Sequence, residues 1–220
     1  MFITGNLSMD KKQVEKKKKE NLWFFNRWAS WYDYSGISLW LRYVQKKAVD
    51  SLDIKARNYI LDASCGTGEL LRYLQKKVPL AKLYGVDISP LMIKAAKKKL
   101  GKQAILKEGN VEQLPFASCS VDIVFSTEAF HHYLYPEKAV REFHRSLMPK
   151  GILVIADLNF GSPVVHKLFK WLEPGHIGIY SKKQFKEMFE QAGFKVLNQR
   201  RIGLFAIVTT GVKDKESKKN

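Results

Sequence analysis

The sequence predicts a doubly wound α/β fold: a mostly parallel sheet with helices on both faces. From Tyr59 onward short apolar runs alternate with longer amphipathic stretches, a rhythm typical of parallel βαβ units. The 220 residues, 45% hydrophobic and 27% charged, suit one globular domain and exclude a disordered or collagen-like chain. We therefore expect one such domain with short appendages.

Helices are expected before the first strand. Residues 23–43 carry nine aromatic side chains, and the spacing of Phe24, Trp28 and Trp31 predicts a helix with one apolar face. A second helical pattern runs over about 38–52. We expect a basic, flexible arm at 1–22, a main domain at 23–212 and a basic tail at 213–220. The main domain is expected to begin with lid helices at about 23–53 and to contain an insertion at about 160–180.

The strands and helices of the main domain follow in alternation. Strands are predicted at 59–64, 82–88, 104–109, 121–127 and 151–158, and helices at 68–77, 90–100 and 136–147. Pro149 and Gly151 are expected to stop the last of these helices. After a helix at 181–192, two further runs at 194–202 and 204–212 have only Gly203 between them. Strands joined so tightly must be antiparallel, which gives seven strands, five of them parallel and followed by an antiparallel pair.

The charge is the unusual feature of the composition. Lys and Arg number 38 against 21 Asp and Glu, a net charge of +17, which raises nucleic acid, an anionic membrane surface or an acidic substrate as partners. Both ends are Lys-rich, but the rest of the chain is basic too. Two cysteines, Cys65 and Cys119, are too few for a disulfide framework. With no apolar run of membrane-spanning length and no secretory leader, we expect a cytoplasmic protein.

A glycine pair follows the first predicted strand. Gly66 and Gly68 leave room for a ligand to approach the backbone at the start of a helix. Asp87 ends the second strand, at the distance suited to the hydroxyls of an adenosine ribose. Leu71 stands where a dinucleotide site needs a third glycine, and Asp62 places a negative charge beside the loop. Such a charge favours a ligand with an ammonium or sulfonium group, S-adenosylmethionine rather than NAD.

Four segments, in order and spacing, resemble the class I S-adenosylmethionine-dependent methyltransferases. They read ILDASCGTGEL, YGVDIS, EGNVEQLPFASCSVDIVFSTEAFHH and LMPKGILVIADLN, and they are most similar to the ubiquinone/menaquinone biosynthesis methyltransferase-like branch. The resemblance implies a Rossmann-like seven-stranded sheet with an N-terminal helical lid. It implies transfer of a methyl group to a small-molecule or lipid/quinone-like acceptor, with S-adenosyl-L-methionine as cofactor and no metal.

The resemblance also implies cofactor contacts. A segment at 25–33 is similar to the family's F-x-x-x-A-x-x-Y-D, whose tyrosine lies over the cofactor. Two departures are Ser64, where many members have glycine, and Asn110, where an aspartate is frequent. The implied contacts are Tyr32 as the lid residue, Asp62, Gly66 and Gly68 for the methionine end, Asp87 for the ribose, Ile88, Asn110 and Val111 for the adenine, and Ser126 beneath the methionine.

Further polar residues are candidates for the acceptor side. His131 and His132 follow the fourth strand and are candidate catalytic bases, although we expect at least one of them to brace its loop instead. Asp157 and Asn159 end the fifth strand as candidate substrate-binding groups. The insertion that follows adds three more candidate acceptor-lining residues: His166, Trp171 and His176.

Other functions remain open from the sequence. An RNA or protein methyltransferase, a non-catalytic nucleic-acid-binding module on the same fold, and an NAD-dependent oxidoreductase are the alternatives. The basic arm beside an aromatic stretch also raises peripheral contact with an anionic membrane. The acceptor atom and the oligomeric state are not readable from the residues.

Overall fold

The computed structural model describes residues 11–28, 36–159, 165 and 177–214. Its helices are α1 (Lys11–Trp28), α2 (Gly36–Val49), α3 (Glu69–Lys77), α4 (Pro90–Leu100), α5 (Pro136–Ser146) and α7 (Lys182–Gln191), with short 3₁₀ turns η2 (Gly101–Gln103) and η3 (Phe130–His132). Its strands are β1 (Tyr59–Ala63), β2 (Lys82–Asp87), β3 (Ala104–Glu108), β4 (Val121–Thr127), β5 (Leu147–Leu158), β6 (Phe194–Ile202) and β7 (Ala206–Lys213).

The strands form one sheet in the order β3-β2-β1-β4-β5-β7-β6. Neighbouring strands from β3 to β5 pair in parallel, while β7 pairs antiparallel with both β5 and β6. The strand order reverses between β1 and β4, which is where open α/β sheets bind ligands. The predicted doubly wound, Rossmann-like fold is confirmed.

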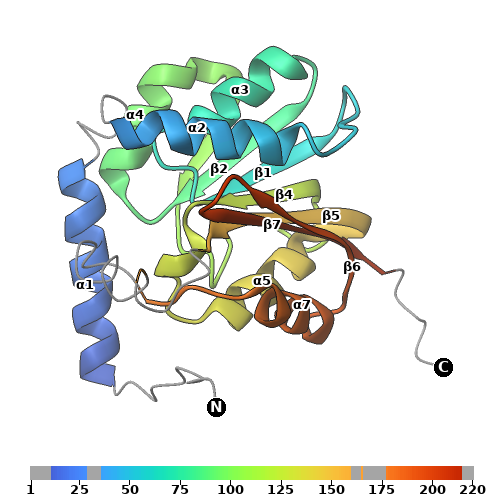
Figure 1. Cartoon of the computed structure of the whole chain (residues 1–220). Helices are drawn as coiled ribbons and strands as arrows, with labels where there is room; N and C mark the ends of the chain where they lie inside the picture. Colours follow the sequence, from blue (N-terminus) through green and yellow to red (C-terminus); the bar gives the residue numbers. More distant parts are fainter. Residues whose placement is uncertain (1–10, 29–35, 160–164, 166–176, 215–220) are drawn as a thin grey trace.

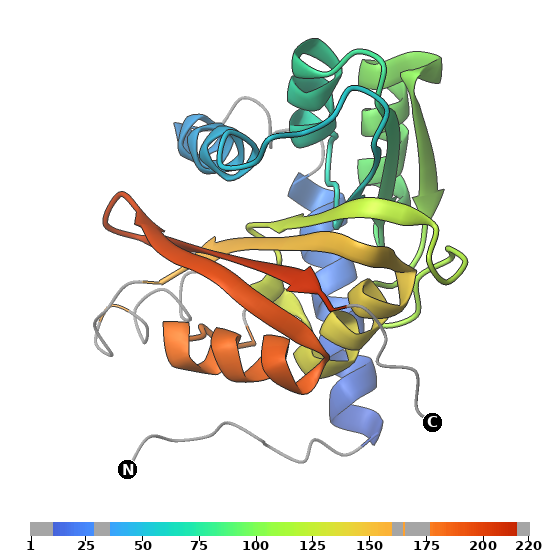
Figure 2. The ribbon, with the colours of Figure 1, turned by 90° about the vertical axis from the view of Figure 1, so that its right-hand side faces the viewer.

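The helices bury two separate cores, one on each face of the sheet (Figure 2). Because successive strand residues point to opposite faces, Ile60 of β1 packs under α2, α3 and α4, and its neighbour Leu61 packs against α5 and α7. Helix α1 stands apart at the left of Figure 1, beside the start of α2. The boundary expected at residue 22 falls inside α1.

Local sequence explains where two of the helices begin. Ser89 caps α4 by accepting a hydrogen bond from the Met92 amide at 3.1 Å, with Pro90 in the first turn. Ser181 and Gln184 form a reciprocal capping box at the start of α7. Both helices therefore start within a residue of their predicted positions.

Three predicted boundaries differ from the structure. The strand expected at Gly151 begins at Leu147, because Leu147 pairs with Val121 across a register shift in β4, so Pro149 lies inside β5 rather than in a break. Helix α2 spans 36–49 instead of 38–52. The turn between β6 and β7 covers 203–205, where Arg201 donates to the Leu204 carbonyl oxygen at 3.1 Å.

A buried lysine on the last strand holds the end of α5. Lys213 is 3% exposed, and its ammonium donates to the carbonyl oxygens of His144 at 2.9 Å and Leu147 at 2.8 Å. These carbonyls belong to or adjoin the last turn of α5, where the helix leaves acceptors unpaired and favours a cation. The contact therefore joins the sheet to α5 through a charge.

We expect Lys213→Met to lower the free energy of unfolding by about 2 kcal/mol, because buried carbonyl oxygens lose their charged donor. Urea unfolding measures the change. Lys195→Met, on the exposed side of the neighbouring strand β6, is the matched control and should unfold near the wild-type midpoint. Equal midpoints for the two variants would contradict the structural role of Lys213.

Candidate active site

The loop between β1 and α3 is built by residues with positive φ. Ser64, Gly66 and Gly68 have φ of 68°, 52° and 84°, a region that glycine enters without strain. A Cβ on Gly68 would lie 2.8 Å from Leu100 Cδ1, whereas one on Gly66 would meet no atom within 4 Å. Gly68 thus permits close helix packing, and Gly66 faces open space.

Asp87 fixes this loop from the neighbouring strand. Its carboxylate accepts hydrogen bonds from the amides of Gly66 and Ser89, each at 2.9 Å. Burial raises the pKa of the Asp87 carboxyl to about 6, and these backbone donors limit the rise. The side chain is therefore held at the end of β2 by the two segments that flank it.

Asp62 lies in β1 and is 2% exposed. Its Oδ1 is buried and has no hydrogen-bond partner among the described residues. Burial and, to a smaller extent, the nearby charge of Asp87 together raise the pKa of this carboxyl to about 8. A buried carboxylate oxygen without a donor is a site where a cationic group, such as an ammonium, would be stabilised.

A cavity opens where the carboxyl ends of β1 to β4 meet. The wall is formed by five segments, from the loops after each of these strands and from α1 and α2: residues 64–67 with Glu69; Asp87, Ile88 and Met92; residues 110–112; residues 127–129 and 132–134; and Lys18, Phe25 and Gln45.

The predicted adenine contacts lie together on one wall. Ile88 is 38% exposed and Val111 is buried, and both line the cavity. Asn110 Oδ1 accepts the Glu112 amide at 2.9 Å, so its second lone pair is the one left for a ligand. Glu112, which we did not predict, also lines the cavity and accepts the Tyr135 amide at 3.0 Å.

A tyrosine hydroxyl connects two of the loops. Tyr133 Oη lies 3.0 Å from Ser64 Oγ and 2.9 Å from Ser126 Oγ. Ser126 is fully buried and is not part of the cavity wall, whereas Tyr133 is. Burial raises the pKa of the Tyr133 phenol above its ordinary range. We did not predict a role for Tyr133, although its position directly after the histidine pair that follows β4 could have indicated one.

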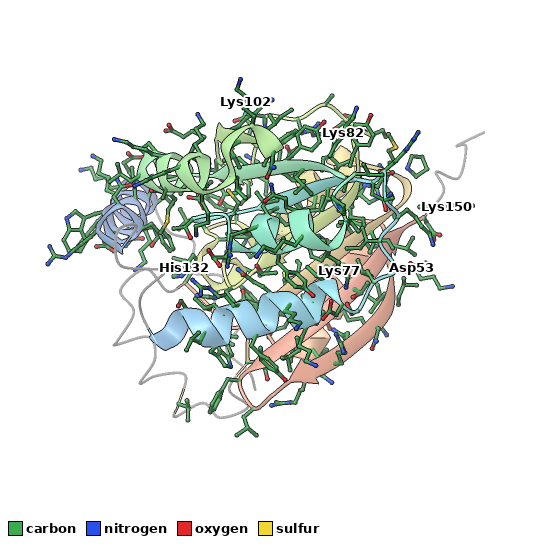
Figure 3. All side chains as sticks on the ribbon, turned by 90° about the horizontal axis from the view of Figure 1, so that it is seen from above. Asp53, Lys77, Lys82, Lys102, His132 and Lys150 are labelled. Atoms are coloured by element: carbon green, nitrogen blue, oxygen red, sulfur yellow. The ribbon has the colours of Figure 1, made fainter. Side chains whose placement is uncertain are left out.

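The structure gives the two histidines different surroundings. His131 Nδ1 lies 2.5 Å from Asp157 Oδ1, and the His131 amide donates to Asp157 Oδ2 at 2.7 Å. His131 is buried away from the cavity, and His132 lines it. In Figure 3 His132 is labelled on the side where α1 and the start of α2 lie.

Helix α1 covers the histidine segment. Phe25 meets the His132 ring edge-on at 4.8 Å between centroids, and Asn21 donates to the His132 carbonyl oxygen at 3.2 Å. Ser89 Oγ donates to Asn26 Oδ1 at 2.6 Å, which joins α1 to the start of α4. These contacts place α1 over the cavity.

Several predicted site residues are not brought to the cavity or lie outside the described residues. Asp157 bonds to His131, and Asn159 is held by the Tyr180 carbonyl oxygen and by Arg201, so neither is free to serve as the substrate group we expected. The predicted residues outside the described part of the chain are Tyr32, Trp31, His166, Trp171 and His176. Within the described residues, no cluster of His, Cys, Asp or Glu is arranged to hold a metal ion.

A charged cluster closes the cavity edge beside α3. The Glu69 carboxylate contacts Arg42 of α2 at 2.9 Å, Arg72 of α3 at 2.9 Å and Lys99 of α4 at 2.5 Å. Burial alone would raise the pKa of Glu69, but hydrogen bonds from Lys99 and Arg72 bring it below its usual value. One carboxylate thus fixes three helices around the cavity.

The raised carboxyl pKa values make stability depend on pH. Burial raises the pKa of Asp62 to about 8 and that of Asp87 to about 6, against an ordinary 3.8. The folded state then binds these protons more tightly than the unfolded state, so the free energy of unfolding falls as pH rises from about 4 to about 8.

We expect Asp62→Asn to remove most of this fall in the free energy of unfolding between pH 6 and 8 in ligand-free protein, measured by urea unfolding. Asp53→Asn, at an exposed carboxylate, should keep the wild-type slope, and an equal slope in Asp62→Asn would contradict the assignment.

Comparison with known proteins agrees with this geometry. Residues 61–155, which include β2, β3, β4 and most of β1 and β5, match the family model described as a methyltransferase domain. The chain is 28% identical over 205 residues to demethylmenaquinone methyltransferase of Staphylococcus aureus, covering 80% of this chain and 84% of that protein.

Solved structures share the fold. The methyltransferase bound to the Haloferax volcanii Trm112 methyltransferase activator superposes with a TM-score of 0.79 at 23% identity, over 87% of this chain and 98% of that one. A SAM-dependent methyltransferase from Aquifex aeolicus gives 0.65 at 23% identity, over 77% and 89%.

The unpartnered Asp62 oxygen fits a cationic ligand, and the cavity lies where the strand order of the sheet reverses. Together with the matched methyltransferase domain and the 28% identical relative, these features support a class I S-adenosylmethionine-dependent methyltransferase.

Proposed function

We propose that this methyltransferase acts on a small, largely apolar acceptor of quinone-like or lipid-like character. The observation that carries the proposal is the cover that α1 forms over the cavity, with Phe25 and Lys18 in its wall. A covered cavity admits a small molecule or a narrow head group more readily than a folded RNA or protein surface. The 28% identical demethylmenaquinone methyltransferase supports the quinone-like class.

The cofactor contacts are part of the proposal. Asp62 is suited to the ammonium of the methionine end, and Asp87 to the ribose, since its carboxylate lines the cavity. Ile88 and Val111 offer apolar surface to the adenine, and Asn110 an amide beside it. The other contacts keep the roles that the resemblance implies. These are Gly66 and Gly68 at the methionine end, the buried Ser126 beneath the methionine, and Tyr32 as the lid residue. When bound, S-adenosylmethionine supplies an electrophilic methyl group on its sulfonium.

The chain's own residues then have three tasks. Phe25 and the rest of the covering helix exclude water from the cavity. The walls align the acceptor, since methyl transfer depends on placing a nucleophile behind the methyl group. His132 is the cavity-facing base that takes a proton from an acceptor hydroxyl or ring carbon, and His131, bonded to Asp157, is a positioning residue.

Cofactor binding tests the assigned ribose site. We expect micromolar affinity for S-adenosylmethionine and none for NAD by titration calorimetry, with binding lost in Asp87→Ala because the ribose acceptor and the support of Gly66 disappear together. The exposed-site variant Asp53→Ala should bind like the wild type. Unchanged binding by a folded Asp87→Ala protein, checked by circular dichroism, would refute the site.

Catalysis tests the role of His132. We expect His132→Asn to lower kcat about 100-fold or more, the usual contribution of a positioned base, while cofactor affinity stays near wild type. The remote variant His144→Asn, beside Phe194, should keep its rate. A wild-type rate in His132→Asn would remove this residue from the mechanism.

The acceptor class is tested by following labelled methyl groups. Transfer from labelled S-adenosylmethionine into the organic phase of a metabolite and lipid extract supports the proposal. Label recovered in RNA or protein instead would favour the alternative that the net charge of +17 permits. Cofactor-independent, salt-sensitive RNA binding without any transfer would favour a binding module.

A further inference from the structure

Among the described residues, several exposed large apolar side chains lie at the carboxyl edge of the sheet or on elements beside it. They include Trp23 (62% exposed), Leu39 (68%), Leu91 (45%), Leu204 (73%) and Phe205 (46%). We call these five residues the apolar rim. They come from the end of α1, the starts of α2 and α4, and the β6–β7 turn, elements that follow the carboxyl ends of the parallel strands or lie beside them. Soluble proteins seldom gather exposed apolar groups on one face without a partner for them.

The elements of the rim share one side of the molecule. Figure 1 shows α1 and the start of α2 at the left, and the β6–β7 turn at the end of the sheet that lies nearer to them. The turn is tied to its surroundings, because Asn159 donates to the Phe205 carbonyl oxygen at 2.7 Å and Arg200 donates to the Lys47 carbonyl oxygen at 2.6 Å. Leu204 and Phe205 are therefore held in place rather than loosely attached.

Positive charge accompanies the rim. Helix α1 contains seven basic and two acidic residues, and α4 contains four basic and no acidic residues. On α1 the exposed Lys12, Lys16, Lys19 and Arg27 share a face with Trp23, since they recur three or four residues apart. Arg27 lies over the Trp23 ring at 5.6 Å. One helix face thus presents an aromatic group and a row of cations.

We propose that this face docks on an anionic phospholipid surface, with the apolar rim entering the head-group region and the α1 cations meeting lipid phosphates. The exposed Leu39, Leu91 and Leu204 distinguish it from a nucleic-acid interface, because aliphatic side chains offer neither a charge to phosphates nor a ring on which bases stack. Interfacial helices combine basic residues with Trp and Leu in this way. The inference rests on the proposed lipid-like acceptor, and it places the cavity entrance where such an acceptor is dissolved.

Vesicle flotation tests the proposal with the full chain. We expect binding to phosphatidylcholine vesicles that contain phosphatidylglycerol, weak binding to phosphatidylcholine alone, and release by high salt. A triple variant, Lys12→Gln/Lys16→Gln/Lys19→Gln, should lose at least tenfold in partitioning, since each lysine near an anionic surface contributes about fivefold. The matched control is Lys82→Gln/Lys102→Gln/Lys150→Gln, with lysines that Figure 3 labels away from α1.

The apolar contribution has its own matched pair of variants. Leu204→Ser/Phe205→Ser should lose about tenfold or more in partitioning, whereas Leu80→Ser/Ile105→Ser, equally exposed but remote from the rim, should partition like the wild type. Absence of wild-type binding to the anionic vesicles overturns the proposal, and so does an equal loss in rim and control variants. Tight binding to single-stranded RNA without vesicle binding overturns it in favour of nucleic acid.

Methyl transfer to a short-tailed quinol in the absence of vesicles separates the two proposals. Transfer without flotation leaves the proposed function standing and overturns membrane docking. Flotation without transfer overturns the proposed function and leaves membrane docking standing. We expect Leu204→Ser/Phe205→Ser to keep the wild-type rate on this water-soluble acceptor, because neither residue belongs to the cavity wall.

Discussion

The hydrogen bonds accepted by the Asp87 carboxylate are the constraint on which the rest of the site depends. They join the end of β2 to the loop after β1 and to the start of α4. Gly85 of β2 also leaves room for the loop after β1, because a Cβ there would lie 2.9 Å from Cys65 Sγ. The backbone of the loop is thereby fixed before any ligand arrives, so binding costs little ordering. The positions of Ser64 and Tyr133 follow from that loop.

The molecule separates its charges by depth. The acidic side chains of Asp87 and Glu112 are buried in the cavity wall and that of Asp62 is buried in β1, while most of the basic side chains are exposed. The interior therefore favours a cationic cofactor although the net charge is +17. The net charge thus says little about what the cavity binds, and its effect is confined to partners that meet the outer surface. The cavity and the outer surface thus differ in the charge of the ligands that they favour.

The sequence predicted most of the fold, because strand and helix periodicities and capping residues are local properties. It predicted the cavity segments after β1 and β2 for the same reason, through Gly66 and Asp87. It did not predict that β5 begins at Leu147, since pairing across a bulge overrides the local effect of Pro149. Nor did it separate His131 from His132, because the contact with Asp157 joins residues 26 positions apart. Contacts between residues far apart in the sequence produce no periodic pattern from which they could be predicted.

The contact of Lys213 with α5 has a consequence for the order of folding. Strand β7 follows both β5 and β6 in the sequence, yet it lies between them in the sheet. During synthesis α5 and β5 emerge well before the ammonium that neutralises the end of α5. The nascent sheet therefore carries an open edge at β5 until the final strand arrives, and it is exposed to pairing with other chains in that interval. The sheet is therefore completed only after β7 is synthesised, although the loop after β1 is made much earlier.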